Sequence, residues 1–295
     1  MLRKVKTAID LSGFYLSLPF IKKEVCYTYM NLFFVSIHRL GFLIRYHITS
    51  FVYFLSFFGK IIRSIKLSHF KDKVFHMHIQ EQLLYNFVEA LFVVALLGLS
   101  LGTVIFLVGY PILVSLGQGQ LLYQLLISII LRELGPLLLA FVVIARSATT
   151  LSTEISTMII TKEIEAYIAV GLDTVTYLIV PRFLGIIFSL FLLLIYFAFF
   201  GLIAPILITN FLGKITFEAY LTGIFQTLSV QTFFISSAKA IIFGIIIGTV
   251  SPYYGLKNSE EGKEVAQSSV KAVGISLLLV IASNFVITFF SYALG

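Results

Sequence analysis

The chain has 295 residues, of which 59% are hydrophobic and only 12% are charged. Soluble domains carry roughly 25% charged residues, so this composition excludes an ordinary water-soluble protein and indicates one embedded in a membrane. The formal net charge of +7 is concentrated near the start, where contact with anionic lipid at the cytoplasmic face explains a basic tract beside apolar spans better than nucleic acid does.

Residues 1–80 form a basic N-terminal region, and residues 81–295 form the expected transmembrane domain. We expect no cleavable signal peptide, because Asp10 interrupts the only early apolar run and no small-residue cleavage pattern follows. The segment 48–59 is apolar for about a dozen positions, short of the roughly 20 that a spanning helix needs. Basic residues flank it, so we predict a helix lying in the membrane interface rather than a crossing.

Five later segments are long and apolar enough to cross a bilayer: 83–114, 121–151, 178–209, 232–250 and 270–292. The connectors after the first and third of these contain Lys214 as their single Lys or Arg, whereas the other side holds the basic N-terminal region and several further cations. The positive-inside rule therefore places the N-terminus in the cytoplasm and, after five crossings, the C-terminus outside. The prediction is an all-α membrane protein with an N-terminal interfacial helix plus five transmembrane helices.

Two pairs of glycines with four-residue spacing favour close packing of helices: Gly98 with Gly102, and Gly244 with Gly248. Such spacing removes side chains from one stripe, so that two helix backbones can approach. Contact within one subunit and contact between subunits both remain open.

Several charges occur inside the second span. With a rise of about 1.5 Å per residue from Leu121, Glu133 lies roughly 18 Å along the helix, near the middle of the bilayer. Pro136 lacks a backbone N–H, so the turn before it is expected to be weakened. Arg132 and Glu133 are neighbours that point about 100° apart, so we do not expect them to form a simple pair. Arg146 lies further along, near the cytoplasmic boundary.

Lys239 is another isolated charge, within the fourth span. Charges at this depth are costly unless they are paired or face a cavity. For Glu133 and Lys239, a pair across helices and a lipid-accessible cavity at a subunit interface both stay open. For Arg146 and Glu154, nearer the boundary, paired or snorkelling side chains are favoured.

The segment 161–171 has the features of a short amphipathic helix between the second and third spans. Thr161 is expected to cap it, Glu163 and Glu165 suit its positive N-terminal end, and Gly171 suits its C-terminal stop. Three apolar residues share one face at helical spacing: Ile164, Tyr167 and Ile168. This face needs a groove to occupy, and a partner protein is favoured over the bilayer surface.

Two other classes of membrane protein are alternatives. A secondary transporter would need its own ion-coupling site, often with inverted repeats, and no convincing repeat is found. An integral lipid-modifying enzyme would need clustered catalytic groups, but all five histidines precede the spans, and His76 with His78 suits an interfacial position better than a metal site. The single cysteine, Cys26, excludes an intrachain disulfide and a Cys-based metal site. No GxxxxGK[ST] run is present, so no nucleotide-binding P-loop and no cofactor are expected.

Six short runs carry a resemblance to a known family: LRELGP at 131–136, ARS at 145–147, EISTM at 154–158, EIEA at 163–166, VPR at 180–182 and YYGL at 253–256. In this order and spacing they resemble the MlaE-type permeases, the membrane subunits of ABC transporters that move lipids between bacterial membranes, with plastid relatives. The resemblance covers residues from about 80 to 292. The chain departs from the family pattern at Thr149, Thr150 and Thr153, where Gly and Ala are common, and this bears on local helix packing and on substrate preference.

The resemblance implies a homodimer in the bacterial inner membrane, with a cytoplasmic N-terminus and a periplasmic C-terminus. It implies two partners, a cytoplasmic ABC ATPase subunit and an MCE-domain lipid-binding protein on the outer side, and phospholipid or a related lipid as the substrate. Glu133 and Lys239, with Arg132 beside them, match polar positions near the lipid pathway, and Arg146, Glu154 and Arg182 are structural polar residues. The coupling helix that docks on the ATPase would consist of Thr161, Lys162, Glu163, Ile164, Glu165, Tyr167 and Ile168.

Overall fold

The computed structural model describes residues 49–50, 52–65, 73–212, 216–260 and 265–293. Residue contacts divide the chain into two units, Met1–Ser56 and Phe57–Gly295. The predicted N-terminal helix at 48–59 is confirmed in its described residues, which are helical at 49–50 and from 52 to 64, and the basic segment before it lies outside the described residues. Its position in the membrane interface stays a prediction.

Five helical stretches in the described part of the chain are long and apolar enough to cross a membrane: Phe75–Ser115, Leu121–Ile160, Val175–Thr209, Val230–Lys257 and Val265–Ala293. This confirms the predicted all-α fold with five spans. Each stretch is longer than a bilayer core requires, so the helices tilt or extend beyond it.

The first three spans are built from several consecutive helices. They are α2 (Lys73–Asn86), η2 (Val88–Ala90) and α3 (Leu91–Ser115); α4 (Leu121–Ile127), η3 (Ser128–Glu133), α5 (Leu134–Val143), η4 (Ile144–Ala148) and α6 (Thr149–Ile160); and η5 (Val175–Ile179) with α8 (Val180–Leu212). The fourth and fifth spans are α10 (Val230–Glu260) and α11 (Val265–Ala293). Two short helices lie in the connectors: α7 (Glu163–Ala169) and α9 (Phe217–Thr227).

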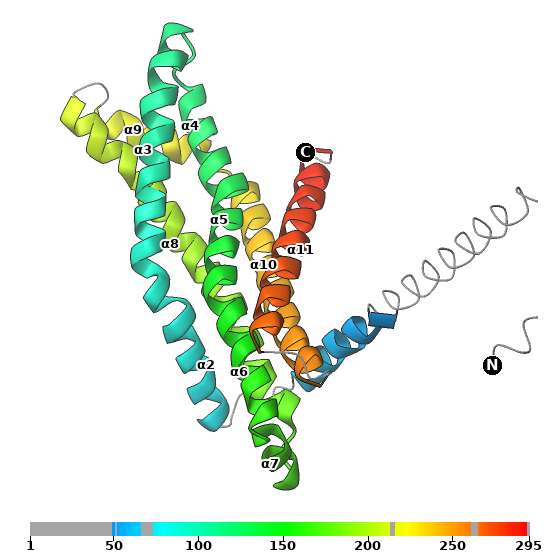
Figure 1. Cartoon of the computed structure of the whole chain (residues 1–295). Coiled ribbons are helices and arrows are strands. Elements are labelled where there is room, and N and C mark those ends of the chain that lie inside the picture. The colour runs from blue at the N-terminus through cyan, green and yellow to red at the C-terminus, as the bar shows by residue number, and fades with distance from the viewer. Residues whose placement is uncertain (1–48, 51, 66–72, 213–215, 261–264, 294–295) are drawn as a thin grey trace, which may run out of the picture. The chain divides into compact units, whose positions relative to one another are not determined.

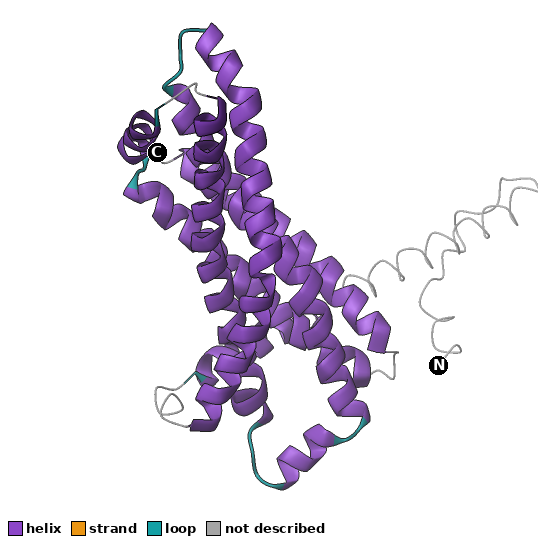
Figure 2. Ribbon diagram, turned by 90° about the vertical axis from the view of Figure 1, so that its left-hand side faces the viewer, coloured by secondary structure: helices purple, strands orange, loops and turns teal. Residues whose placement is uncertain are grey.

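The two short helices lie at opposite ends of the bundle formed by residues 57–293. Figure 1 shows α7 at the end where α6 finishes, and α9 at the other end, beside the turn between α3 and α4. The same separation is visible in the rotated view of Figure 2. Helix α9 was not predicted from the sequence, although its buried residues Tyr220 and Ile224 are four positions apart, the spacing of one helix face.

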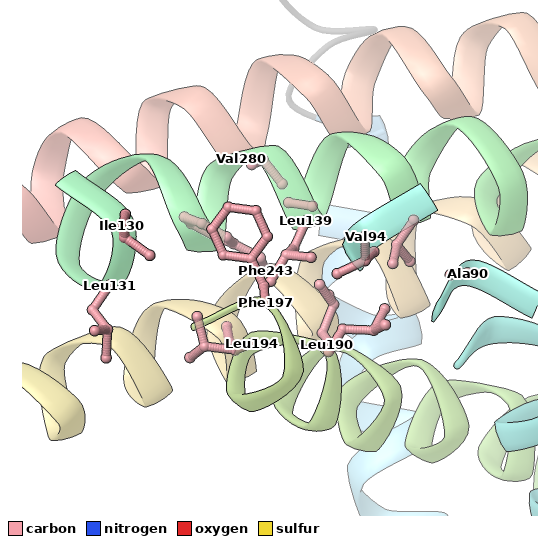
Figure 3. Close-up of a cluster of buried hydrophobic side chains, with 14 of the residues drawn as sticks. Ala90, Val94, Ile130, Leu131, Leu139, Leu190, Leu194, Phe197, Phe243 and Val280 are labelled. Atoms are coloured by element: carbon pink, nitrogen blue, oxygen red, sulfur yellow. The ribbon is translucent and has the colours of Figure 1, made fainter. Parts of the chain in front are cut away.

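The core lies where all five spans meet. Val94 of α3, Leu139 of α5, Phe197 of α8, Phe243 of α10 and Val280 of α11 are fully buried and converge in Figure 3. In a membrane, such a core is stabilised mainly by close van der Waals packing, because lipid tails are as apolar as the side chains. The core therefore determines which helix faces are in contact.

Both glycine stripes pack against α8 of the same subunit. A Cβ added at Gly98 would lie 3.0 Å from a backbone oxygen of α8, and one at Gly102 would overlap the carbonyl oxygen of Gly201. Added Cβ atoms at Gly244 and Gly248 would come within 2.8 and 2.9 Å of α8 atoms. Hydrogen in place of a side chain thus lets α3 and α10 approach the α8 backbone closely.

A second apolar cluster lies near the end of the bundle at which α7 is found. Ile61 of the N-terminal helix is fully buried, in a cluster with Phe75, Val180 and Phe183. Phe57 also approaches Tyr253 of α10, with ring centroids 5.9 Å apart. The second half of the N-terminal helix is therefore packed on the start of the first span and the start of α8.

Candidate functional site

The second span departs from α-helical geometry immediately before Pro136, as the sequence predicts. Residues Ser128–Glu133 form a π-helix. Pro136 has no N–H to donate to the carbonyl four residues earlier, which is that of Arg132. The ammonium of Lys239, on α10, donates to this carbonyl oxygen at 2.7 Å. The proline thus leaves a backbone acceptor inside the bundle, and a cation from another helix occupies it.

Lys239 is fully buried and its three N–H donors all have acceptors. Besides the Arg132 carbonyl, it donates to Glu133 Oε2 at 2.9 Å and to Thr288 Oγ1 at 2.8 Å. The Thr288 hydroxyl in turn donates to the same Glu133 oxygen at 2.9 Å. Of the two arrangements left open by the sequence, the isolated subunit shows the charged pair across helices.

Arg132 connects this cluster to the end of α11. Its guanidinium donates to Ser291 Oγ at 3.0 Å and to the Ser291 carbonyl at 3.2 Å, and it lies 4.0 Å from the ring centroid of Tyr292. Although these neighbours were not expected to form a simple pair, Arg132 Nε lies 3.7 Å from Glu133 Oε1, within ion-pair distance. No hydrogen bond joins these two buried atoms, and neither has a hydrogen-bond partner among the described residues.

The cluster holds two cations and one carboxylate, so its formal charge is +1. The side chains of Arg132 and Glu133 are 19% and 26% exposed, whereas Lys239 is completely enclosed. Ser291, which accepts from Arg132, also lines a mainly apolar groove of about 400 Å³ between α10 and α11. The arrangement therefore holds excess positive charge beside an apolar groove, and in the isolated subunit Arg132 and Glu133 are its accessible members.

The contribution of α11 to this cluster was not predicted from the sequence. Thr288 and Ser291 are three residues apart on an otherwise apolar span, a spacing that places both on one face. Polar side chains on one face of a membrane helix often bind across to another helix. The spacing of Thr288 and Ser291 could therefore be recognised in the sequence, but the span that they contact could not.

The charges nearer the boundary have ion-pair partners. Arg146 lies 2.6 Å from Glu89 Oε2, and Arg182 lies 3.1 Å from Glu154 Oε2. Glu89, which precedes α3, was not identified from the sequence. The first pair joins η4 of the second span to the first span, and the second pair joins α6 to the third span.

The short helix between the second and third spans is present, as α7. Gly171, at φ +81°, follows the helix and suits the predicted stop. Thr161 is not the cap, however, because Lys162 occupies that position in a left-handed conformation at φ +63° without a capping side-chain bond. The single proton of the Thr161 hydroxyl is instead shared between the Thr157 carbonyl at 3.0 Å and the Glu163 carboxylate at 2.9 Å.

The apolar face of α7 is largely uncovered. Tyr167 and Ile168 are 40% and 62% exposed, and Ile164 is half-buried. No residue of α7 is buried against the rest of the described chain. The helix therefore presents an apolar face at the end of the bundle.

Among the described residues, no group of three or more His, Cys, Asp or Glu side chains is arranged to hold a metal ion. His76 and His78 belong to α2, and His78 Nδ1 lies 3.2 Å from Glu81 Oε2. The other three histidines and Cys26 lie outside the described residues.

Comparison with known proteins gives matches over most of the chain. Residues 79–290 match the family described as Permease MlaE. A probable ABC transporter permease protein of Rickettsia typhi is 29% identical over 210 residues, which are 71% of this chain and 81% of the relative. The intermembrane phospholipid transport system permease protein MlaE of Haemophilus influenzae is 24% identical over 265 residues, 89% of this chain and 94% of the relative. The family match includes Arg132, Glu133, Lys239 and the whole of α7.

Proposed function

The chain belongs to the MlaE permease family, and from this premise we propose that it is the membrane subunit of an ABC transporter that moves phospholipid between membranes. As a permease it is not an enzyme, and its sequence contains no GxxxxGK[ST] motif. The observation that carries the proposal is the exposed amphipathic helix α7, which lies within the matched region at the end of the second span. The named relatives that are ABC transporter permeases support this class of transporter.

In the proposed mechanism, α7 is the mechanical link to a separate ATPase. Ile164, Tyr167 and Ile168 would fill an apolar groove of that subunit, and Glu163 and Glu165 would lie at the rim. Burial of three such side chains favours docking by several kcal/mol before ordering costs, at roughly 1.5–3 kcal/mol for each fully buried side chain. ATP-driven movement of the ATPase would then be transmitted through α6 to the second span.

The charged cluster is proposed to border the lipid pathway. Arg132, Glu133 and Lys239 carry a formal charge of +1 at membrane depth, where an uncompensated charge is costly. A lipid phosphate beside Arg132 would offset that charge, while its acyl chains could lie along the apolar groove between α10 and α11. Lys239 would act indirectly, by holding Glu133 and the Arg132 carbonyl in place.

The remaining assignments follow the family resemblance and charge distribution. We propose a homodimer in the bacterial inner membrane, with an MCE-domain lipid-binding protein on the outer side. Lys162, Lys257 and Lys271 are near the α7 end of the bundle, which supports a cytoplasmic position for that end and a periplasmic position for the C-terminus.

The docking role of α7 can be tested by co-purification of the ATPase from membranes that contain the full complex. Ile164→Asp and Glu165→Lys should each reduce ATPase recovery at least several-fold, with membrane insertion unchanged. Ala166→Asp is the matched control, because it adds the same aspartate about 200° around the helix from Ile164. Full recovery with both test variants would refute the docking role.

A further inference from the structure

A second groove, of about 580 Å³, lies along α6, on the side of the bundle where α7 is found. Four threonines line it, Thr149, Thr150, Thr153 and Thr157, together with the paired side chains of Glu154 and Arg182. We propose that this threonine groove binds the headgroup of a phospholipid that carries a primary ammonium beside its phosphate. The proposal rests on the proposed lipid-transport function and specifies which class of lipid the chain prefers.

The threonine hydroxyls act as acceptors toward the groove. Each donates its proton to a helix carbonyl four residues earlier, over distances of 2.8–3.0 Å. A hydroxyl has one proton and two lone pairs, so a proton committed to the backbone leaves only acceptor capacity. The wall formed by α6 therefore offers hydrogen-bond acceptors and no donors.

Neighbouring helices use part of this capacity. Because the threonine protons point to the backbone, Tyr85 is the donor to Thr150, at 3.0 Å. Ser269 directs its one proton mainly to Thr153 Oγ1, at 2.6 Å, with the Thr149 carbonyl as a longer contact at 3.4 Å. One lone pair remains on the hydroxyl oxygens of Thr150 and Thr153. Thr149 and Thr157 have no side-chain donor among the described residues, so both of their lone pairs remain for a ligand.

The ion pair of the groove supplies the complementary polar groups. Arg182 Nη2 lies 3.1 Å from Glu154 Oε2, so the pair has no net charge. The Glu154 side chain is 45% exposed and accessible to a ligand. Arg182 Nη1 is buried without a hydrogen-bond partner among the described residues. The groove thus combines several acceptors with a guanidinium that is 15% exposed and has N–H donors beyond the one directed at Glu154.

A zwitterionic headgroup with N–H donors matches this set. Its phosphate oxygen can accept from Arg182, while its three ammonium protons can be donated to threonine oxygens and to Glu154. A phosphate without an ammonium group offers only hydrogen-bond acceptors, and these would face the acceptor oxygens of the threonines. A quaternary ammonium has the same charge but no N–H to donate, so it would leave the threonine oxygens unpaired.

The depth of the groove also fits a headgroup. At about 1.5 Å per residue from Leu121, Thr149 and Thr157 lie roughly 42 and 54 Å along the second span. Bilayers are about 40–45 Å thick including the headgroup regions, and tilt shortens the projected distance. The threonines therefore stand at the level of the headgroups of the leaflet on the α7 side.

The test uses the full-length chain in nanodiscs that contain equal amounts of dioleoyl phosphatidylethanolamine and dioleoyl phosphatidylcholine. Native mass spectrometry of the released protein measures which lipid stays bound. We expect an enrichment of the ethanolamine lipid of about tenfold, the equivalent of one or two net hydrogen bonds. Thr149→Val with Thr157→Val should bring the ratio close to one, because valine keeps the shape and removes both hydroxyls.

Two further variants separate the hydroxyl effect from misfolding. Thr157→Ser keeps a hydroxyl and should keep the preference. Thr222→Val, on α9 at the other end of the bundle, also removes a hydroxyl that donates four residues back and should leave the ratio unchanged. A shift of the ratio by Thr222→Val as large as that of the double variant would overturn the proposal.

Other results would also overturn it. These are equal retention of both lipids by the unaltered chain, preference for dioleoyl phosphatidylglycerol, or efficient cross-linking of two copies through Thr157→Cys, which would identify the groove as a subunit interface. An absent lipid preference beside intact ATPase coupling would reject only the headgroup assignment. A clear preference without ATPase coupling would reject the proposed transporter class and retain the lipid site.

Discussion

Replacement of Glu133 by Gln should be the most damaging conservative change in the charged cluster. Glu133→Gln keeps the shape of the side chain but removes the one negative charge between Arg132 and the buried Lys239. The formal charge of the cluster then rises from +1 to +2. Lys239→Met has the opposite effect, because it leaves Arg132 and Glu133 with no net charge.

The structure indicates the size of both effects. Removing one partner of a buried pair costs about 3–5 kcal/mol, because the other charge stays buried and uncompensated, and this applies to Glu133→Gln. After Lys239→Met, Thr288 still donates to Glu133, and the main loss is the donor to the Arg132 carbonyl. An unsatisfied buried acceptor costs about 1–3 kcal/mol, so Lys239→Met should be clearly milder.

The assay is a double-mutant cycle on the purified full-length chain in detergent micelles. Denaturant titration measures the free energy of unfolding of the unaltered chain, both single variants and the double variant. Because the double variant returns the cluster to +1, it should be at least about 1 kcal/mol more stable than the sum of the single effects predicts. Lys271→Met, which removes an exposed cation of α11, is the control and should change stability by less than about 0.5 kcal/mol.

Two outcomes would refute this reasoning. If Lys239→Met destabilises the chain as much as Glu133→Gln does, the net charge of the cluster does not control its stability. If the two changes are additive, the 2.9 Å contact between the side chains carries no interaction energy. Either result would make the hydrogen bonds to Thr288 and Arg132 the dominant contribution instead.

Three further variants test other parts of the structure by thermal and pH-dependent unfolding. Gly102→Ala should destabilise the contact of α3 with α8 by about 1–3 kcal/mol, whereas Gly274→Ala should be neutral, because an added Cβ at Gly274 meets nothing within 4 Å. The hydrogen bond from the Thr176 hydroxyl lowers the pKa of Asp173, so its stabilising effect is present above about pH 4 and is lost as the pH falls through the folded pKa. Asp173→Asn should therefore lower the free energy of unfolding at pH 7 and change it little in strong acid, and an equal cost at both pH values would contradict this. Burial raises the pKa of Tyr220, whose hydroxyl donates to the Leu202 carbonyl at 2.9 Å, so above about pH 10 the unaltered chain should lose stability that Tyr220→Phe does not lose.

The fold class and the positions of the spans could be predicted from the sequence, because these depend on local properties of the chain. A helix must contain about 20 apolar residues to cross a bilayer, and five segments satisfy this requirement. The weakened turn before Pro136 and the helix end before Gly171 also follow from the chemistry of single residues. The polar cap that Thr161 was expected to provide did not form, since Lys162 adopts a left-handed conformation there.

The contacts between helices were decided only by the tertiary structure. Helical periodicity gives the face on which a side chain lies, but not the helix that this face meets. The bond between Lys239 and Glu133 joins positions 106 residues apart, and the contact of Arg132 with Ser291 joins positions 159 apart. For the same reason the glycine stripes could be recognised in the sequence, while their partner, the backbone of α8, could be identified only after the five spans had packed together.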